Sequence, residues 1–171
     1  MAEATIPVGG GFSYSGGVAT RGACPRIPNS GALTGLEDSP YRSLEVSIPN
    51  ASVLTLRATP YTLIPAPGAG KIIQVIGGML SLIYTAPAFT ESADNLELRY
   101  TDGSGAIIAL LEMTSWITLT ANSFLSIVPL KDVILVSNAA VVLFNNGDGE
   151  FGNSGGSLLR AKLEYAVHSA T

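Results

Sequence analysis

The stretch that most constrains the fold is the longest apolar run in the chain, KIIQVIGGMLSLIYT at residues 71–85. Its apolar spacing fits a helical face as well as a strand buried on both sides, so periodicity alone does not decide between them. Gly77 and Gly78 favour the strand, because each would cost a helix about 1 kcal/mol, and β-branched residues precede them. We predict a long strand with a glycine bulge that bends from one sheet toward another. Burial on both faces requires a second layer, which this chain or another subunit can supply.

From residue 44 onward the chain has short segments of β type separated by turn residues. PAPGAG at 65–70 and TDGSG at 101–105 are predicted turns, and the alternation within 157–168 is the clearest period-2 pattern. For residues 120–125, the pattern does not decide between a strand and a short helical turn. Besides the central run, the predicted strands are Leu44–Ile48, Ser52–Arg57, Tyr61–Ile64, Asn95–Thr101, Ala106–Leu111, Trp116–Leu119, Val133–Ser137, Ala140–Asn145 and Ser157–His168. This pattern predicts an all-β, antiparallel β-sandwich, jelly-roll-like, over residues 51–171.

Residues 1–50 have scattered glycines and prolines and no persistent period, which predicts an extended N-terminal arm. Ordering an arm costs roughly 1–2 kcal/mol per residue, so we expect it to become ordered only against a partner. Segments such as Thr5–Val8 or Leu44–Ile48 are candidates for addition to an exposed sheet edge. The dispersed apolar anchors of the arm are Ile6, Val8, Phe12, Tyr14, Val18, Ile27, Leu33, Leu36 and Tyr41.

Composition points to association and away from several partners. The chain of 171 residues is 47% hydrophobic but only 13% charged, against roughly 25% charged in average soluble domains. A net charge of −4 with nine scattered basic residues argues against direct nucleic-acid binding. The sequence shows neither a signal peptide nor an apolar segment long enough to span a membrane, so we expect synthesis in a cytoplasm. Cys24 is the single cysteine and is interpreted as an ordinary free thiol, because no histidine is near it in the sequence.

One motif suggests catalysis. GNSGG at 152–156 matches the G-x-S-x-G nucleophile pattern and looks like the serine loop of trypsin-like proteases. A serine nucleophile needs a base within hydrogen-bonding distance, and the single histidine, His168, lies at the far end of the following strand. At about 3.3 Å per residue, Ser154 and His168 do not meet unless the chain folds back sharply. We therefore predict no enzymatic activity and interpret 145–156 as a glycine-rich loop between two strands.

The remaining candidate residues have structural interpretations as well. Asp148 and Glu150 suggest a cation site, but their spacing differs from an EF-hand loop. PAPGAGK at 65–71 lacks the first glycine of a Walker loop and has Ile72 where serine or threonine would meet magnesium. We predict no catalytic, cofactor or metal site.

Four more side chains are of types that occur in functional sites. Trp116 suits core packing better than sugar stacking. His168 is expected to be an exposed terminal residue, because metal sites need several donors. Glu112 and Asp132 are expected to flank strands rather than to form an acid/base pair.

Three stretches resemble virion proteins of tailed bacteriophages, and in particular head decoration (cement) proteins. They are TLIPAPGAGKIIQVIGGMLSL, the hairpin NLELRYTDGSG, and GDGEF followed by SLLRAKLEYAV. The resemblance covers roughly residues 50–168 and implies a jelly-roll trimer bound to the outside of an icosahedral shell, with no catalytic residues.

We therefore expect a virion structural protein that is made in the host cytoplasm and ends on the capsid surface. Its expected partners are itself, as a homotrimer, and the major capsid protein through the N-terminal arm. Deleting residues 2–40 should leave trimers intact and abolish shell binding. The alternatives are a phage tail or spike protein that binds a glycan or receptor, and a hydrolase whose activity is lost on Ser154→Ala.

Overall fold

The computed structural model describes residues 12–15, 18–21, 40–90, 95–153 and 155–170. The chain divides into two units, Met1–Ser39 and Pro40–Thr171. In the first unit, β1 (Phe12–Ser15) and β2 (Val18–Arg21) form an antiparallel pair. This strand pair was not predicted, although the Gly-Gly pair at 16–17 between the two segments is a hairpin signal.

The second unit begins earlier than the predicted boundary at residue 50. β3 (Tyr41–Ile48) pairs antiparallel with β10 (Leu158–Ser169), with Ile48 opposite Leu159 and Tyr41 opposite Ala166. The assignment of Leu44–Ile48 to the arm, and its proposed role on another protein's sheet edge, are therefore wrong. The reason is hydrophobic burial, because Leu44, Val46 and Ile48 alternate toward the core of this chain.

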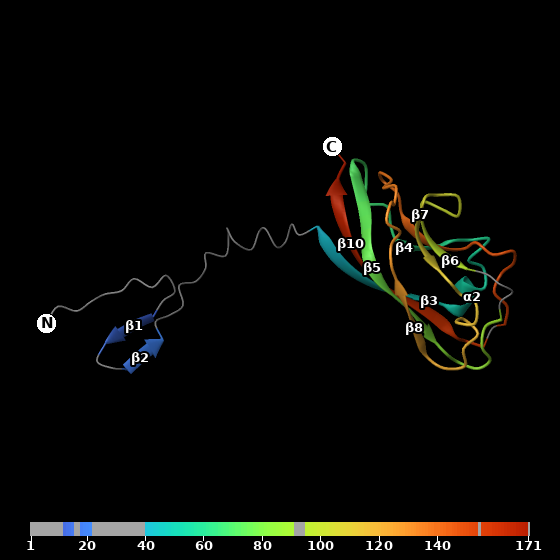
Figure 1. Ribbon diagram of the computed structural model, residues 1–171, viewed down its shortest axis with the longest axis horizontal. Coiled ribbons are helices and arrows are strands. Elements are labelled where there is room, and N and C mark those ends of the chain that lie inside the picture. The colour runs from blue at the N-terminus through green and yellow to red at the C-terminus, as the bar shows by residue number, and fades with distance from the viewer. Residues whose placement is uncertain (1–11, 16–17, 22–39, 91–94, 154, 171) are drawn as a thin grey trace. The chain divides into compact units, whose positions relative to one another are not determined.

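The eight strands described in the second unit form two four-stranded sheets, β3-β10-β5-β8 and β4-β9-β6-β7 (Figure 1). The pairing is nested, because β3 pairs with β10, β4 with β9, β5 with β8, and β6 with β7. A long antiparallel hairpin rolled up in this way is a jelly roll, so the predicted fold class is confirmed. The other strands are β4 (Tyr61–Ile64), β5 (Lys71–Ile83), β6 (Leu96–Tyr100), β7 (Ile107–Leu111), β8 (Ser123–Ile127) and β9 (Val141–Asn145).

Three predicted strands are wrong. Residues 52–57 belong to α2 (Asn50–Val53) and the turns after it, because Val53 and Leu56 are both fully buried at helical spacing. Residues 116–119 form turns, with two amides bonded to the carbonyl of Met113. Residues 133–137 contribute only an isolated bridge between Ser137 and Ile72. For the ambiguous segment 120–125, the structure places the start of β8 at Ser123.

The predicted glycine bulge is present in β5. Gly77 lies opposite Glu164 and Val75 lies opposite Tyr165, so Ile76 is the extra residue on β5. β5 nevertheless stays in one sheet, because it pairs with β10 from Lys71 to Ile83. The predicted bend between sheets is therefore wrong.

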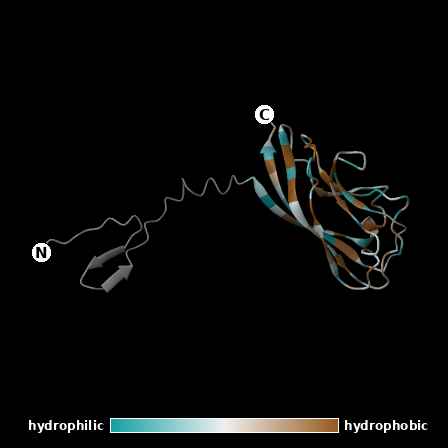
Figure 2. Cartoon of the chain, viewed as in Figure 1, coloured by the Kyte–Doolittle hydropathy of each residue, from teal (hydrophilic) through white to brown (hydrophobic). Residues whose placement is uncertain are grey.

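Burial of β5 on both faces is also wrong for most of its length. The inner face of β5 is buried, as at Ile73 and Leu82, whereas Ile76 and Met79 on the outer face are exposed. The alternation of hydrophobic and hydrophilic residues is visible along the strands in Figure 2. Among the described residues, no second layer covers Ile76 and Met79 on the outer face of β5.

Tyr100 links the two sheets through the core. It lies on β6, is fully buried, and donates a hydrogen bond of 2.5 Å from its hydroxyl to the carbonyl of Ile73 on β5. Burial raises the pKa of Tyr100 to about 12, because a phenolate is disfavoured away from water.

This raised pKa predicts a loss of stability at alkaline pH. The unfolded chain ionises Tyr100 near its ordinary value of 10.0, whereas the folded chain resists ionisation up to about 12. The stability that the buried, neutral Tyr100 adds to the folded protein is therefore complete below pH 10 and is lost as the pH rises toward 12. We expect Tyr100→Phe to lower the free energy of unfolding by about 1 kcal/mol at pH 7, because the hydrogen bond is lost. Between pH 10 and 12 the variant should lose less additional stability than the wild type, because it has no phenol to ionise at this position. Urea unfolding across this range measures both effects. Equal pH slopes for wild type and variant, with exposed Tyr41→Phe as control, would contradict the assignment.

Candidate functional site

The outer face of the β3-β10-β5-β8 sheet has two different halves. Residues directly opposite one another in neighbouring strands point to the same face. On the β3 and β10 half, the outward residues include Glu45 opposite Lys162, and Arg160 forms an exposed ion pair of 3.5 Å with Glu45. This half is charged and hydrated.

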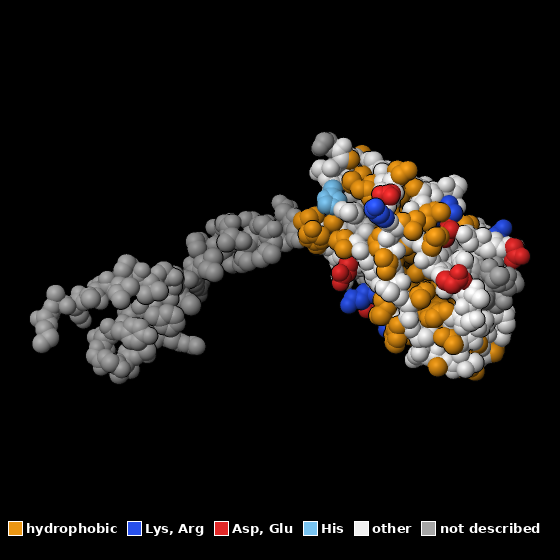
Figure 3. Space-filling model, viewed as in Figure 1, with side chains coloured by type: hydrophobic (Ala, Val, Ile, Leu, Met, Phe, Trp, Pro, Cys, Tyr) orange, Lys and Arg blue, Asp and Glu red, His pale blue; other side chains and the backbone are white. Residues whose placement is uncertain are grey.

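The β5 and β8 half is uncharged and has exposed hydrophobic side chains next to serines. Met79 lies opposite Ser126 and Ser81 opposite Phe124, so the outward positions from Ile76 through β8 carry no charge. Four large hydrophobic side chains are exposed here, and we call them the β5–β8 patch: Ile76 (44% exposed), Met79 (38%), Phe124 (64%) and Val128 (67%). Figure 3 shows hydrophobic side chains gathered at several places on the visible face of the body, with few charged side chains among them. Such a patch is a candidate interaction surface.

The patch ends at an open sheet edge. β8 is the last strand in the order of its sheet, and no strand of the described residues pairs with its far side. Its sequence, SFLSI, contains no charged residue and no proline. An edge of this kind is a template for pairing with another chain. The edge and the patch together form one continuous candidate interface.

Residues 129–138, which we call the side loop, continue this surface around the side of the sandwich. The backbone amide of Leu130 donates a hydrogen bond of 2.8 Å to the carbonyl of Ile108 on β7. The backbone amide of Asn138 donates one of 2.8 Å to the carbonyl of Lys71 at the start of β5. The side loop therefore runs from the end of β8 across to the other sheet and back to β5. Its exposed hydrophobic residues are Leu130 (41%), Ile134 (74%) and Leu135 (39%).

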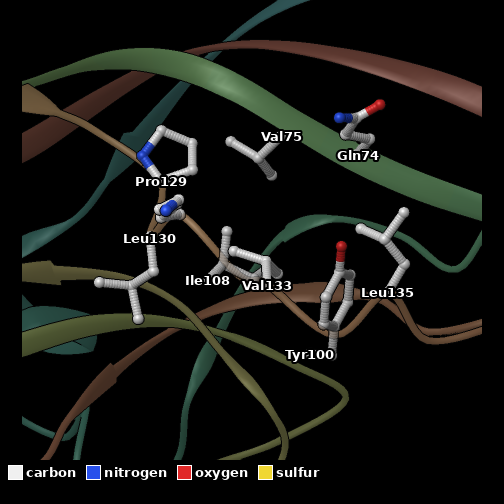
Figure 4. A pocket seen from close by; sticks show the side chains of 9 residues that line it. Gln74, Val75, Tyr100, Ile108, Pro129, Leu130, Val133 and Leu135 are labelled. Carbon is white, nitrogen blue, oxygen red and sulfur yellow. The ribbon is translucent and has the colours of Figure 1, made fainter.

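A small cavity of about 140 Å³ lies under the side loop, between the sheets. Figure 4 shows Val75, Tyr100 and Ile108 lining the cavity together with Leu130 and Leu135, which come from the side loop. Beside the cavity, Val133 and Val136 of the side loop pack against the hydrophobic core.

A buried polar cluster, which we call the Glu97–Arg99 cluster, lies on the outer face of the other sheet. Glu97 is only 2% exposed and is paired with Arg99 and with the amide of Asn146. The guanidinium of Arg99 also donates a hydrogen bond of 3.0 Å to the carbonyl of Gly105 and lies 5.4 Å from the centre of the Phe144 ring. These contacts hold the hairpin loop 101–105 against the sheet. Sequence reasoning missed this cluster because Glu97 and Arg99 alternate with apolar residues as solvent-facing side chains would.

Glu150 has a structural role in the glycine-rich loop. Its two carboxylate oxygens accept hydrogen bonds from the amides of Arg57 (3.0 Å) and Ala58 (2.7 Å), in the turn after α2. Asn145 is fully buried and shapes the same loop. Its side-chain amide donates a hydrogen bond of 3.1 Å to the carbonyl of Gly149. Asp148 lies in this loop too, and no group of three or more metal-ligating side chains forms among the described residues.

Only one of the two residues of the hydrolase hypothesis lies in the described part of the chain. His168 lies on β10, where its Nε2 is 3.0 Å from the side-chain oxygen of Gln74. Ser154 lies outside the described residues, and so does Cys24. The prediction that the protein is not an enzyme stays a prediction.

The other sequence candidates are placed as structural residues. Trp116 packs against the core, as predicted. Glu112 follows β7, as predicted, and accepts hydrogen bonds from the hydroxyl and amide of Thr114, which lower its pKa. Asp132 lies in a turn of the side loop. The segment 65–70 is the predicted turn, with positive φ at Gly68 and Gly70.

Comparisons with protein-family models, with curated proteins and with solved structures gave no significant match. Among the residues described, no helix has the length and apolar character needed to cross a lipid bilayer.

Proposed function

We propose that the protein is a virion structural protein: a capsid decoration (cement) protein that binds the outer capsid surface as a homotrimer and stabilises the shell. The observation that supports this proposal best is the uncharged β5–β8 patch beside an open sheet edge. A surface of this kind is unfavourable in water and is normally covered in an assembly.

The fold is compatible with this role but does not select it alone. Jelly rolls occur in viral capsid proteins, lectins and cupins, so function has to be argued from surfaces. Association through the patch agrees with the low charge content of 13%. The proposed location on a virion is based on the resemblance of the central run and the 95–105 hairpin to phage decoration proteins.

In this proposal the N-terminal arm attaches the trimer to the major capsid protein. Three arms on one trimer act at high effective concentration, so weak individual contacts give tight attachment. A ligand that binds only the assembled shell disfavours its disassembly by mass action.

The arm can be tested by deletion. The carbonyl of Pro40 accepts a hydrogen bond of 3.0 Å from the amide of Val167, so removing residues 2–39 rather than 2–40 spares the sandwich. We expect the shortened protein to form trimers but to lose shell binding in a co-sedimentation assay. Trimers that still decorate shells normally would contradict the role of the arm.

Imaging virions with and without the protein tests the location. We expect density on the outside of the head that disappears with the protein, and shells that then disassemble at lower temperature. Density on the tail would replace the proposal by the tail or spike alternative, for which glycan-array binding is the next measurement.

A further inference from the structure

We infer that a cleft at one end of the sandwich binds a small organic carboxylate, and that Arg42 and Lys71 are the cations that hold its carboxylate group. The ligand class is a carboxylate attached to a short apolar group. This inference goes beyond the proposed function and does not depend on it, because the cleft is formed within a single copy of the chain.

The cleft lies between the two sheets, where β3 and β5 begin and β4 and β10 end. Its apolar lining comes from Ile64, Pro65, Pro67, Ile73 and Val167. Its volume is about 220 Å³, whereas pockets for drug-sized ligands measure roughly 300–1,000 Å³. At roughly 30 Å³ for each non-hydrogen atom, the cleft suits a molecule of about seven such atoms.

Arg42 is a cation on the inner side of its sheet. It lies opposite Tyr165 on β10, and Tyr165 lies opposite Val75 on β5, which is buried in the core. Residues directly opposite one another in neighbouring strands share a face. The next inward residue of β3 is Leu44, which packs against the core. Arg42 therefore breaks the apolar pattern at the point where the inner face opens into the cleft.

Lys71, the first residue of β5, lines the same cleft. Within the described part of the chain, neither cation forms an ion pair. The acidic residues of the neighbouring strands, Glu45 and Glu164, lie on the outer face of the sheet. Arg42 belongs to an edge strand and also borders a hollow on that outer face, which Glu164 lines as well. Two unpaired cations beside one apolar cleft attract an anion.

Backbone hydrogen bonds hold the walls of the cleft in place. The amide of Val167 donates a hydrogen bond of 3.0 Å to the carbonyl of Pro40, which ties the start of β3 to β10. The amide of Gly68 donates one of 3.0 Å to the side-chain oxygen of Asn138, which fixes the turn before β5. Because these walls are already ordered, a ligand loses less free energy to ordering when it binds.

The combination of groups favours an organic carboxylate over an inorganic anion. The parallel N–H groups of a guanidinium match the two oxygens of a carboxylate, and Lys71 adds a second positive charge. Phosphate would lose hydration beside the apolar lining without covering it. A carboxylate with a short apolar group covers the lining and places its charge at the cations.

Hexanoate is the probe, and a ligand-observed NMR titration of the full-length protein measures its binding. We expect a dissociation constant on the order of 1 mM. Acetate has the charge with almost no apolar group, and hexanol has the apolar group without the charge. Each should bind at least about 10-fold more weakly than hexanoate. Acetyl-glycyl-leucine presents the same chemistry at a chain end, so its affinity relative to hexanoate distinguishes a polypeptide terminus from a free acid.

Substitutions then assign the binding to the cleft. Arg42→Met and Lys71→Met should each weaken hexanoate binding at least about 10-fold, because each removes a charge-assisted hydrogen bond. Arg42→Lys keeps the charge without the planar fork and should lose less affinity than Arg42→Met. Lys162→Met is the matched control, because Lys162 is an exposed lysine on the outer face of β10. It should bind hexanoate like the wild type. Thermal unfolding first establishes that the variants are folded.

Three results would overturn the inference. The first is a wild-type protein that does not bind hexanoate well above the expected dissociation constant. The second is unchanged affinity in Arg42→Met, in which case Arg42 is an inward charge that protects the β3 edge from pairing. The third is acetate or hexanol binding as tightly as hexanoate. None of these results bears on the proposed trimer or on shell binding, which are measured separately.

Discussion

Gly78→Ala is expected to lower the free energy of unfolding by about 3 kcal/mol or more. A Cβ at this position would lie 2.2 Å from the backbone carbonyl oxygen of Lys162 and 3.2 Å from the Cα of Leu163. Both atoms belong to the backbone of β10, so no side chain can rotate out of the way. The variant can fold only if β5 and β10, the two central strands of the sheet, move apart.

The neighbouring Gly77 provides the matched control. A Cβ there would have Ile127 as its nearest neighbour, with the carbonyl oxygen at 3.5 Å, which is an ordinary contact. We expect Gly77→Ala to change stability by less than about 1 kcal/mol. Urea unfolding of the two variants makes the comparison. Equal losses would show that the strands are not in the described register at the bulge.

Arg99→Ala is expected to cost about 3 kcal/mol, because it leaves the carboxylate of Glu97 buried without its cation. Glu97 is 2% exposed and Arg99 is 16% exposed. The change also removes the hydrogen bond to Gly105 and the contact with Phe144, so the hairpin loop 101–105 loses an anchor. Chemical denaturation measures the loss.

Two comparisons separate the buried charge from other effects. Arg160→Ala removes the exposed pair with Glu45, whose side chains are 46% and 56% exposed, and should cost less than about 1 kcal/mol. Replacing Glu97 and Arg99 together by methionine should recover most of the stability lost in Arg99→Ala, because no uncompensated charge remains. A double variant no more stable than Arg99→Ala would contradict the explanation.

Much of the fold was predictable where a strand has a regular pattern and clear turns. Tyr61–Ile64 was predicted with its observed bounds, and the period-2 alternation located β10 to within one residue at each end. The bulge in β5 was predictable because two adjacent glycines in a β-branched run have few other interpretations. The strands predicted at 52–57 and 116–119 were wrong, since a short segment with three apolar residues fits a buried turn as well as a strand.

The candidate interface was predictable in kind but not in place. Composition indicates a surface that needs covering, whereas its position depends on which outward residues the strand order brings together. Met79 and Phe124 are 45 positions apart in the sequence and lie on adjacent strands only because β5 pairs with β8. The Glu97–Arg99 cluster was missed for a related reason, because its burial depends on Asn146 and Phe144, which are distant in the sequence.

The nested pairing also bears on how the protein is made. β10 is the last strand of the sandwich in chain order, yet it occupies an interior position between β3 and β5. Until it emerges, β3 has no neighbour in its sheet, and β5 has only the short β8. The nascent chain therefore cannot close this sandwich before β10 has left the ribosome.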